Sequence, residues 1–127
     1  MEKYVLKISI QTTQNTVRMH TDKWEVLKEG PKTVTIQFVD KDGYNEGKKK
    51  QKKRTQFMQP NSGIMRSDSL RFTYSCIWCF PEDELEARNM LVEKVRDSIQ
   101  NKYDHVNNQL KAFNKWRPGI EKQLESL

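Results

Sequence analysis

The sequence predicts an α+β protein: an N-terminal antiparallel sheet of five or six strands, followed by a long C-terminal helix and a short terminal helix. The sheet is predicted by apolar and polar residues that alternate in residues 3–12 and again in residues 32–40. The helix is predicted because residues 82–117 contain neither Gly nor Pro. The 127 residues are expected to form a single domain, mostly β over residues 1–80 and helical over residues 81–127.

The strands are expected in three groups. Residues 3–12 form a half-buried strand with Tyr4, Leu6, Ile8 and Ile10 on its inner face. Residues 16–20 form a short second strand or its bend, residues 23–28 form another short strand, and a Gly-Pro turn leads into residues 32–40. The last strand, residues 71–80, is the most apolar and is expected to be central.

The long helix is expected to begin at Pro81, since Pro lacks only an N–H that would be unpaired there. Apolar residues recur every seven positions along it and predict one buried stripe. They are Leu85, Val92, Ile99, Val106 and Phe113. A helix reaching residue 116 would be roughly 50 Å long at about 1.5 Å per residue. We therefore expect it to bend back near residues 107–108 or to enter a second subunit, as in a homodimer or larger homo-oligomer. A break is expected at residues 117–119, before a short helix over residues 120–127.

Positive charge is concentrated in one segment. The net charge is +6, and the seven residues from Lys48 to Arg54 carry six positive charges. We interpret residues 44–54 as a basic, disordered loop, for which attraction to polyanions is the functional alternative. No run of about 18 apolar residues is present, so no membrane span is expected. Two cysteines and a lysine-rich surface indicate a reducing cytoplasm.

The motifs do not favour an enzyme. Cys76 and Cys79 form a C-x-x-C pair, but inside a strand their side chains point to opposite faces. His20 and His105 have no spacing that pairs them with the cysteines in a zinc site. Neither a G-x-S-x-G motif nor a P-loop occurs. We expect no catalytic residue, no metal and no cofactor.

A ligand site is possible where the last strand meets the helix. Phe80 shares one strand face with Trp78, and Arg88, Asn89 and Met90 follow within about two helical turns. An aromatic ring can stack a base, an amide can pair a base edge, and a guanidinium can bind phosphate. In the alternative interpretation, the aromatic residues are core and the polar ones are solvated.

Four arginines are further candidate phosphate ligands, each with a plain surface role as its alternative. Arg117 would reach a ligand held by a neighbouring subunit, and Arg54, Arg66 and Arg71 would add contacts.

The layout resembles that of phage Thoeris anti-defence sponges, which sequester cyclic ADP-ribose-type signals. The resemblance lies in a short basic chain, an N-terminal sheet, an aromatic strand leading into a long helix, and Phe80, Arg88, Asn89, Met90 and Arg117 as the residues that would carry the site. It implies a non-enzymatic binder of a cyclic nucleotide signal in the host cytoplasm. It also implies a homo-oligomer with pockets between subunits.

Two other functions compete with this one. A small nucleic-acid-binding accessory protein would use the basic segment from Lys48 to Arg54, although basic residues in such proteins usually extend along a whole face. A protein that inhibits a host enzyme is the third class.

Overall fold

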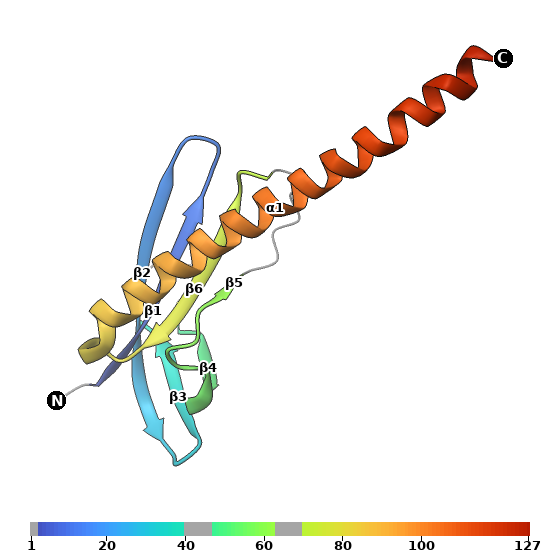
Figure 1. Ribbon diagram of the computed structural model, residues 1–127. Helices are drawn as coiled ribbons and strands as arrows, with labels where there is room; N and C mark the ends of the chain where they lie inside the picture. The colour runs from blue at the N-terminus through green and yellow to red at the C-terminus, as the bar shows by residue number, and fades with distance from the viewer. Residues whose placement is uncertain (1–2, 40–46, 63–69) are drawn as a thin grey trace. The chain divides into compact units, whose positions relative to one another are not determined.

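The computed structural model describes residues 3–39, 47–62 and 70–127 (Figure 1). The chain divides into two compact units, Met1–Arg96 and Asp97–Leu127. The first unit contains an antiparallel six-stranded sheet and the start of the long helix α1, and the second contains the rest of α1. The α+β class predicted from the sequence is confirmed.

The sheet has the strand order β4-β3-β2-β1-β6-β5. Its strands are β1 (Tyr4–Thr12), β2 (Val17–Glu29), β3 (Thr33–Phe38), β4 (Lys49–Lys53), β5 (Asn61–Ser62) and β6 (Thr73–Cys79). Short 3-10 turns, η1 (Arg54–Gln56) and η2 (Pro81–Asp83), follow β4 and β6, and α1 spans Glu84–Glu125. The apolar strand β6 is paired on both sides, with β1 and β5.

One continuous strand, β2, replaces the two short segments expected at residues 16–20 and 23–28. Charged residues in its middle hid its continuity, because they interrupt the apolar alternation. The pairing of β2 with β3 shifts between Val26 and Lys28, so Leu27 is the extra residue of a β-bulge. A bulge bends its strand and increases the local twist.

The two faces of the sheet bury separate apolar clusters. On one face, which we call the helix-covered face, sheet residues pack against α1: Ile8, Ile10, Ile77 and Cys79 meet Ala87, Leu91 and Val95. The other face, which we call the concave face, carries Val5, Trp24, Val34, Ile36, Phe38 and Trp78. The expectation that only one face of the first strand is buried is wrong, since Val5 is as inaccessible as Ile8.

The sheet curls toward the concave face. Four strand spacings separate β4 from β6, which would be about 19 Å in a flat sheet at about 4.8 Å per spacing. The Lys52 ammonium nitrogen on β4 nevertheless lies 4.7 Å from the Trp78 ring centroid on β6. The chain after β4 completes this approach: Phe57 forms a bridge with Trp78, and the Met58 N–H donates to the Trp78 carbonyl at 2.8 Å. Met58 has φ 60°, a left-handed conformation unusual for a residue with a side chain.

The basic segment is part of the sheet, so its interpretation as a disordered loop is wrong over residues 47–54. Lys49–Lys53 form β4, which pairs with β3 at the sheet edge. Lys50 lies opposite Ile36 and Lys52 opposite Val34, so both lysines are on the concave face. Residues 44–46 of the predicted loop lie outside the described residues.

The helix α1 is longer than predicted and buries different residues. It continues through Pro118 to Glu125, so the predicted break and separate terminal helix are wrong. The buried positions are Ala87, Leu91 and Val95, at intervals of four residues, whereas Leu85 is 75% exposed. The predicted stripe through Leu85 is therefore wrong in the part of α1 that covers the sheet. Within the described residues, no helix combines the length and apolar character needed to cross a membrane.

Candidate nucleic-acid interface

Three lysines converge on one tryptophan of the concave face. The ammonium nitrogens of Lys7, Lys50 and Lys52 lie 5.7, 5.9 and 4.7 Å from the Trp78 ring centroid. Cations at this range are attracted by the negative face of an aromatic ring. We call these three residues the lysine triad.

The register of the strands determines where the side chains of the lysine triad lie. Lys7 on β1 lies directly opposite Trp78 on β6, so both side chains share the concave face. Lys50 and Lys52 reach the same ring from β4 because the sheet curls. The aliphatic stems of such lysines can cover apolar surface while the ammonium groups stay accessible. Lys50 and Lys52 are both half-buried, unlike the exposed Lys49 and Lys53 that flank them.

The triad is electrostatically strained. Burial lowers the pKa of Lys50 most, and the positive charges of Lys7, Lys52 and Lys48 lower it further. Burial and then the charge of Lys7 lower the pKa of Lys52. Cys76 on the same face acts in the opposite direction on both lysines. A bound anion would relieve this repulsion between the ammonium groups.

No ion pair among residues 3–39, 47–62 and 70–127 involves a triad lysine. The carboxylate nearest in register is that of Asp22, directly opposite Lys7. Its oxygen instead lies 2.7 Å from Nε2 of His20. Within the described part of the chain, the triad is therefore a cluster of positive charge without a paired acid.

The tryptophans under the lysines are core residues. Trp24 is 2% exposed and Trp78 is 4% exposed, and their rings meet edge-on with centroids 5.5 Å apart. Lys50 also lies 5.3 Å from the Trp24 ring centroid. Because the rings are buried and covered, they cannot stack a nucleotide base. What this surface offers a ligand is ammonium donors, which suit phosphate oxygens.

The structure divides the predicted junction site between two environments. Phe80 packs against the concave cluster, with its ring centroid 5.0 Å from that of Phe57. Met90 packs against the helix-covered cluster, and Asn89 is exposed. Arg88 donates from Nη2 to a Glu84 oxygen at 2.9 Å. Phe80 and Met90 therefore pack on opposite faces of the sheet, while Arg88 is paired with Glu84.

A hollow does lie beside Arg88. It has a volume of about 260 Å³ and is lined by Glu84, Leu85 and Arg88. The Nε of Arg88 is buried and has no hydrogen-bond partner among the described residues. This unpaired donor is the feature of the junction that a ligand could satisfy.

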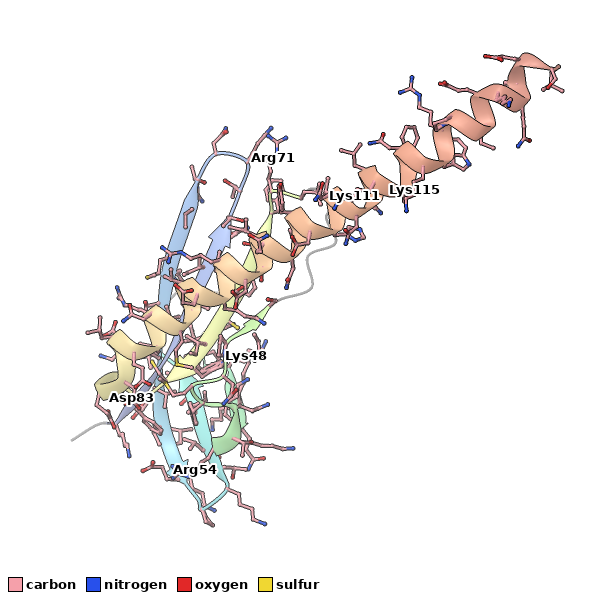
Figure 2. The ribbon with its side chains drawn as sticks, in the orientation of Figure 1. Lys48, Arg54, Arg71, Asp83, Lys111 and Lys115 are labelled. Atoms are coloured by element: carbon pink, nitrogen blue, oxygen red, sulfur yellow. The ribbon has the colours of Figure 1, made fainter. Side chains whose placement is uncertain are left out.

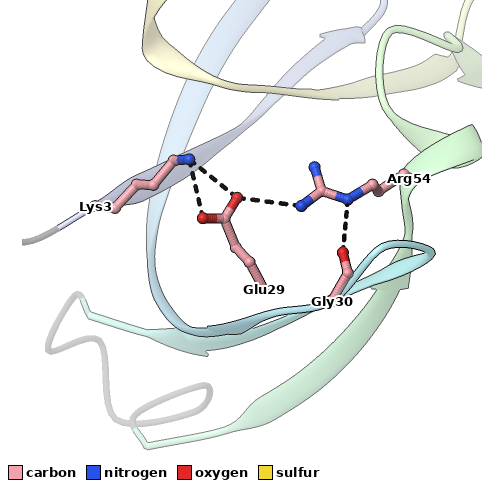
Figure 3. A network of polar contacts seen from close by, with 4 residues as sticks. All are labelled: Lys3, Glu29, Gly30 and Arg54. Carbon is pink, nitrogen blue, oxygen red and sulfur yellow. Dashed lines mark hydrogen bonds and ion pairs between the residues drawn. The ribbon is translucent and has the colours of Figure 1, made fainter.

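Arg54, predicted as a phosphate ligand, binds the turn between β2 and β3 instead (Figure 3). Its Nε donates to the Gly30 carbonyl at 2.8 Å, and its Nη2 lies 3.4 Å from Glu29. The same Glu29 carboxylate accepts from Lys3 at 2.9 and 3.0 Å. Hydrogen bonding from Lys3 is the main cause that holds the pKa of Glu29 below its usual value. Arg54 thus fastens the end of β4 to the sheet.

The remaining predicted arginines make side-chain contacts of their own or lie outside the described residues. Arg71 and Arg54 are at opposite ends of the sheet (Figure 2). Arg71 faces Gln14, whose amide oxygen, when turned toward it, accepts at 3.1 and 3.3 Å. Arg117, in the second unit, donates from Nε to Glu121 at 2.8 Å. Arg66 lies outside the described residues.

The two cysteines lie on opposite faces, as the strand alternation predicts. Cys79 belongs to the helix-covered cluster, and Cys76 lies on the concave face. Burial raises the pKa of the Cys79 thiol to about 11, with smaller contributions from Glu84, Asp83 and Glu82. Such a thiol is a poor nucleophile. Within the described ranges, no three His, Cys, Asp or Glu side chains are grouped so that they could hold a metal ion.

Sequence reasoning missed the triad because the positions of Lys50 and Lys52 depend on the curl of the sheet. No local signal marked them, because the basic segment from Lys48 to Arg54 shows no apolar alternation and lysine stems can occupy inward positions. A scan against models of protein families and searches of curated proteins and of solved structures returned no match. The functional inference therefore rests on the geometry of the concave face.

Proposed function

We propose that the protein is a non-enzymatic nucleic-acid-binding protein that contacts the phosphate backbone through the concave face. The observation that carries this proposal is the convergence of Lys7, Lys50 and Lys52 on Trp78 without a paired acid among the described residues. The exposed Lys49 and Lys53 on the other side of β4 add positive charge nearby. We propose phosphate as the ligand because the aromatic rings are buried and only the ammonium groups of the lysines can donate hydrogen bonds to a ligand.

A protective role accounts for the charge of the basic strand but not for the convergence of three lysines on one ring. Charged side chains on an edge strand, above all lysines, keep other chains from pairing with it. Lys49 and Lys53 fit that role. Lys50 and Lys52 instead bring like charges together in a partly buried position, which opposes folding. Anion binding supplies a reason for such an arrangement.

Salt-dependent titration tests the proposal. Labelled single-stranded and double-stranded oligonucleotides of two unrelated sequences are titrated with the full chain, and binding is followed by fluorescence anisotropy at several salt concentrations. We expect binding that does not depend on sequence and that weakens with salt. The slope of log K against log salt is about −0.9 per phosphate contact for duplex DNA, so three contacts give about −2.7. Absence of binding at low salt would refute the proposal.

The second candidate is the cyclic-nucleotide sponge that the layout resembles. It is favoured by the hollow beside Arg88 and by the unpaired, buried Nε of that residue. In this case a cyclic ADP-ribose-type signal would bind in the host cytoplasm, with Arg117 supplied by a neighbouring subunit of a homo-oligomer. The carboxylate of Glu84 in the lining opposes an anionic ligand, and for that reason we place this candidate second.

Calorimetric titration with a cyclic ADP-ribose-type nucleotide distinguishes the two candidates. A sponge binds this nucleotide, releases it chemically unchanged on heating, and loses about tenfold or more in affinity on Arg88→Ala or Asn89→Ala. The nucleic-acid-binding protein shows no such loss, because neither residue lies on the concave face.

A further inference from the structure

The second unit, Asp97–Leu127, presents an uncovered apolar seam. None of its side chains is buried. The seam begins with Ile99, Tyr103, Val106, Leu110 and Phe113. It continues with Arg117, Ile120, Leu124 and Leu127. Most of the large apolar side chains here are at least half exposed, such as Tyr103 at 64% and Leu110 at 55%. So large an exposed apolar surface marks an interaction site.

The spacing of the seam is that of a coiled coil. Successive positions are separated alternately by four and three residues from Ile99 to Leu127, which is four heptads with an average period of 3.5. A helix that packs on the body of its own domain follows the 3.6 period instead. The part of α1 that covers the sheet differs accordingly: its buried residues Ala87, Leu91 and Val95 are all four residues apart. The seam therefore suits a partner helix.

We propose that the occupant of the seam is the same segment of a second copy, packed antiparallel. The segment suits itself electrostatically, since it carries five Lys or Arg and four Asp or Glu residues and is nearly neutral. Its charged residues lie mainly at positions off the seam, as do Lys111 and Lys115. Two copies can therefore approach without strong repulsion. A near-neutral helix with both signs of charge is a poor match for an anionic membrane surface, which attracts basic helices.

Arg117 sets the orientation. It is the one charged residue at a seam position, and in a parallel, in-register pair it would face Arg117 of the other copy. An antiparallel pair centred between Leu110 and Phe113 avoids this contact. There Arg117 faces Val106 of the second copy, and the two guanidinium groups are about 16 Å apart, at about 1.5 Å per residue. The ion pair from Arg117 Nε to Glu121, at 2.8 Å, turns part of its charge toward the flank.

The flanks of the antiparallel pair also match. In that register Gln100 lies beside Glu121 of the second copy, and Asn107 lies beside Asn114. On the other flank Lys102 lies beside Gln123. No like charges meet at these flanking positions. In coiled coils the residues at such positions determine the choice of partner and the orientation of the helices.

The mass of the full chain in solution tests the assembly. We expect about twice the monomer mass of 15.1 kDa. Leu110→Glu places a charge at the centre of the seam and should return the mass to one chain. Ala112→Glu adds the same charge to an exposed residue off the seam and should leave the dimer intact. A parent protein that is monomeric at tens of micromolar, or a control as disruptive as Leu110→Glu, overturns the proposal.

Disulfide trapping tests the orientation. Val106→Cys and Arg117→Cys are made separately in a Cys76→Ser background, mixed and oxidised. The antiparallel pair predicts a crosslink between the two variants, and weak crosslinking of either variant alone. Crosslinking of each variant alone would indicate a parallel pair and overturn the orientation. The assembly does not depend on nucleic-acid binding, because Leu110→Glu leaves the triad untouched and its oligonucleotide affinity per site should stay within about twofold.

Discussion

The ammonium nitrogen of Lys52 lies 4.7 Å from the ring centroid of Trp78, although three strands separate β4 from β6 in the sheet. This approach requires the curl, to which the bulge at Leu27 and the bridge from Phe57 to Trp78 both contribute. The same curl buries the apolar side of the concave face and gathers the lysines over it. Core packing and the proposed binding surface thus depend on one deformation of the sheet.

Removing the two inward lysines should weaken oligonucleotide binding more than removing two outward ones. The pair Lys50→Gln and Lys52→Gln keeps most of each aliphatic stem and should reduce the salt slope by about 1.8, or about 0.9 per contact. The matched control, Lys49→Gln and Lys53→Gln, removes equal charge from the exposed side of the same strand. Anisotropy titrations across salt measure both. Equal losses for the two pairs would mean that net charge alone attracts the nucleic acid.

Oligonucleotide binding should also weaken at alkaline pH, because the pKa values of Lys50 and Lys52 are lowered in the free protein. A bound phosphate favours the charged ammonium, so binding takes up protons once the pH exceeds these lowered values. Calorimetry in buffers of different ionisation heat should detect this uptake as the pH rises toward 10. Lys50→Arg with Lys52→Arg keeps the charge at every such pH and should remove the effect. A pH profile that is the same in this variant would exclude the triad as its source.

The sequence predicted elements whose alternation is local and missed those that depend on distant partners. Val34, Ile36 and Phe38 show the face of β3 directly, and all three are buried. In β4 the inward positions are Lys50 and Lys52, so no apolar alternation indicates a strand. The strand β4 forms by pairing with β3. Its lysine stems pack over Trp78, which is 26 residues or more away in the chain. Composition alone therefore favoured a disordered loop.

The predicted junction site shows the same limit. Phe80 and Arg88 are close in sequence, and nothing local shows that Phe80 packs with Phe57 on the concave side while Met90 packs under the helix.

The heptad spacing through Leu85 is a second case. Its spacing is correct for the seam from Ile99 onward, but the sheet-covering turns use Ala87 and Leu91 instead.

Leu91→Ala should destabilise the fold strongly, because Leu91 is fully buried against the sheet. Truncating a buried leucine to alanine costs about 2–5 kcal/mol. Leu85→Ala makes the same change at a position that is 75% exposed and should alter stability by less than about 0.5 kcal/mol. Urea unfolding followed by far-UV circular dichroism gives both values. The reverse ranking would show that the stripe through Leu85 covers the sheet.

The Glu29 network should make stability depend on pH in the acid range. The folded-state pKa of Glu29 is below its usual value of 4.5, chiefly because of the hydrogen bond from Lys3. Its contribution is therefore fully present above the unfolded pKa and disappears as the pH falls through the folded one. The urea midpoint of Glu29→Gln should fall below that of the parent at pH 7, and the two should converge near pH 3. Glu125→Gln, near the exposed end of α1, should match the parent at both pH values.

Alkylation of the two cysteines gives a direct test of the binding surface. The Cys79 side chain is fully buried and burial raises its pKa to about 11, so it should resist iodoacetamide at pH 8 in the folded protein. Cys76 is partly exposed on the concave face, where it interacts electrostatically with Lys50 and Lys52. A nucleic acid bound to the triad should therefore slow the alkylation of Cys76, by roughly the factor 1 + [L]/Kd. Mass spectrometry of the peptides that contain each cysteine measures both rates, and Cys79 serves as the internal control for folding. If a saturating oligonucleotide leaves the Cys76 rate unchanged while anisotropy shows full binding, the nucleic acid binds elsewhere on the protein.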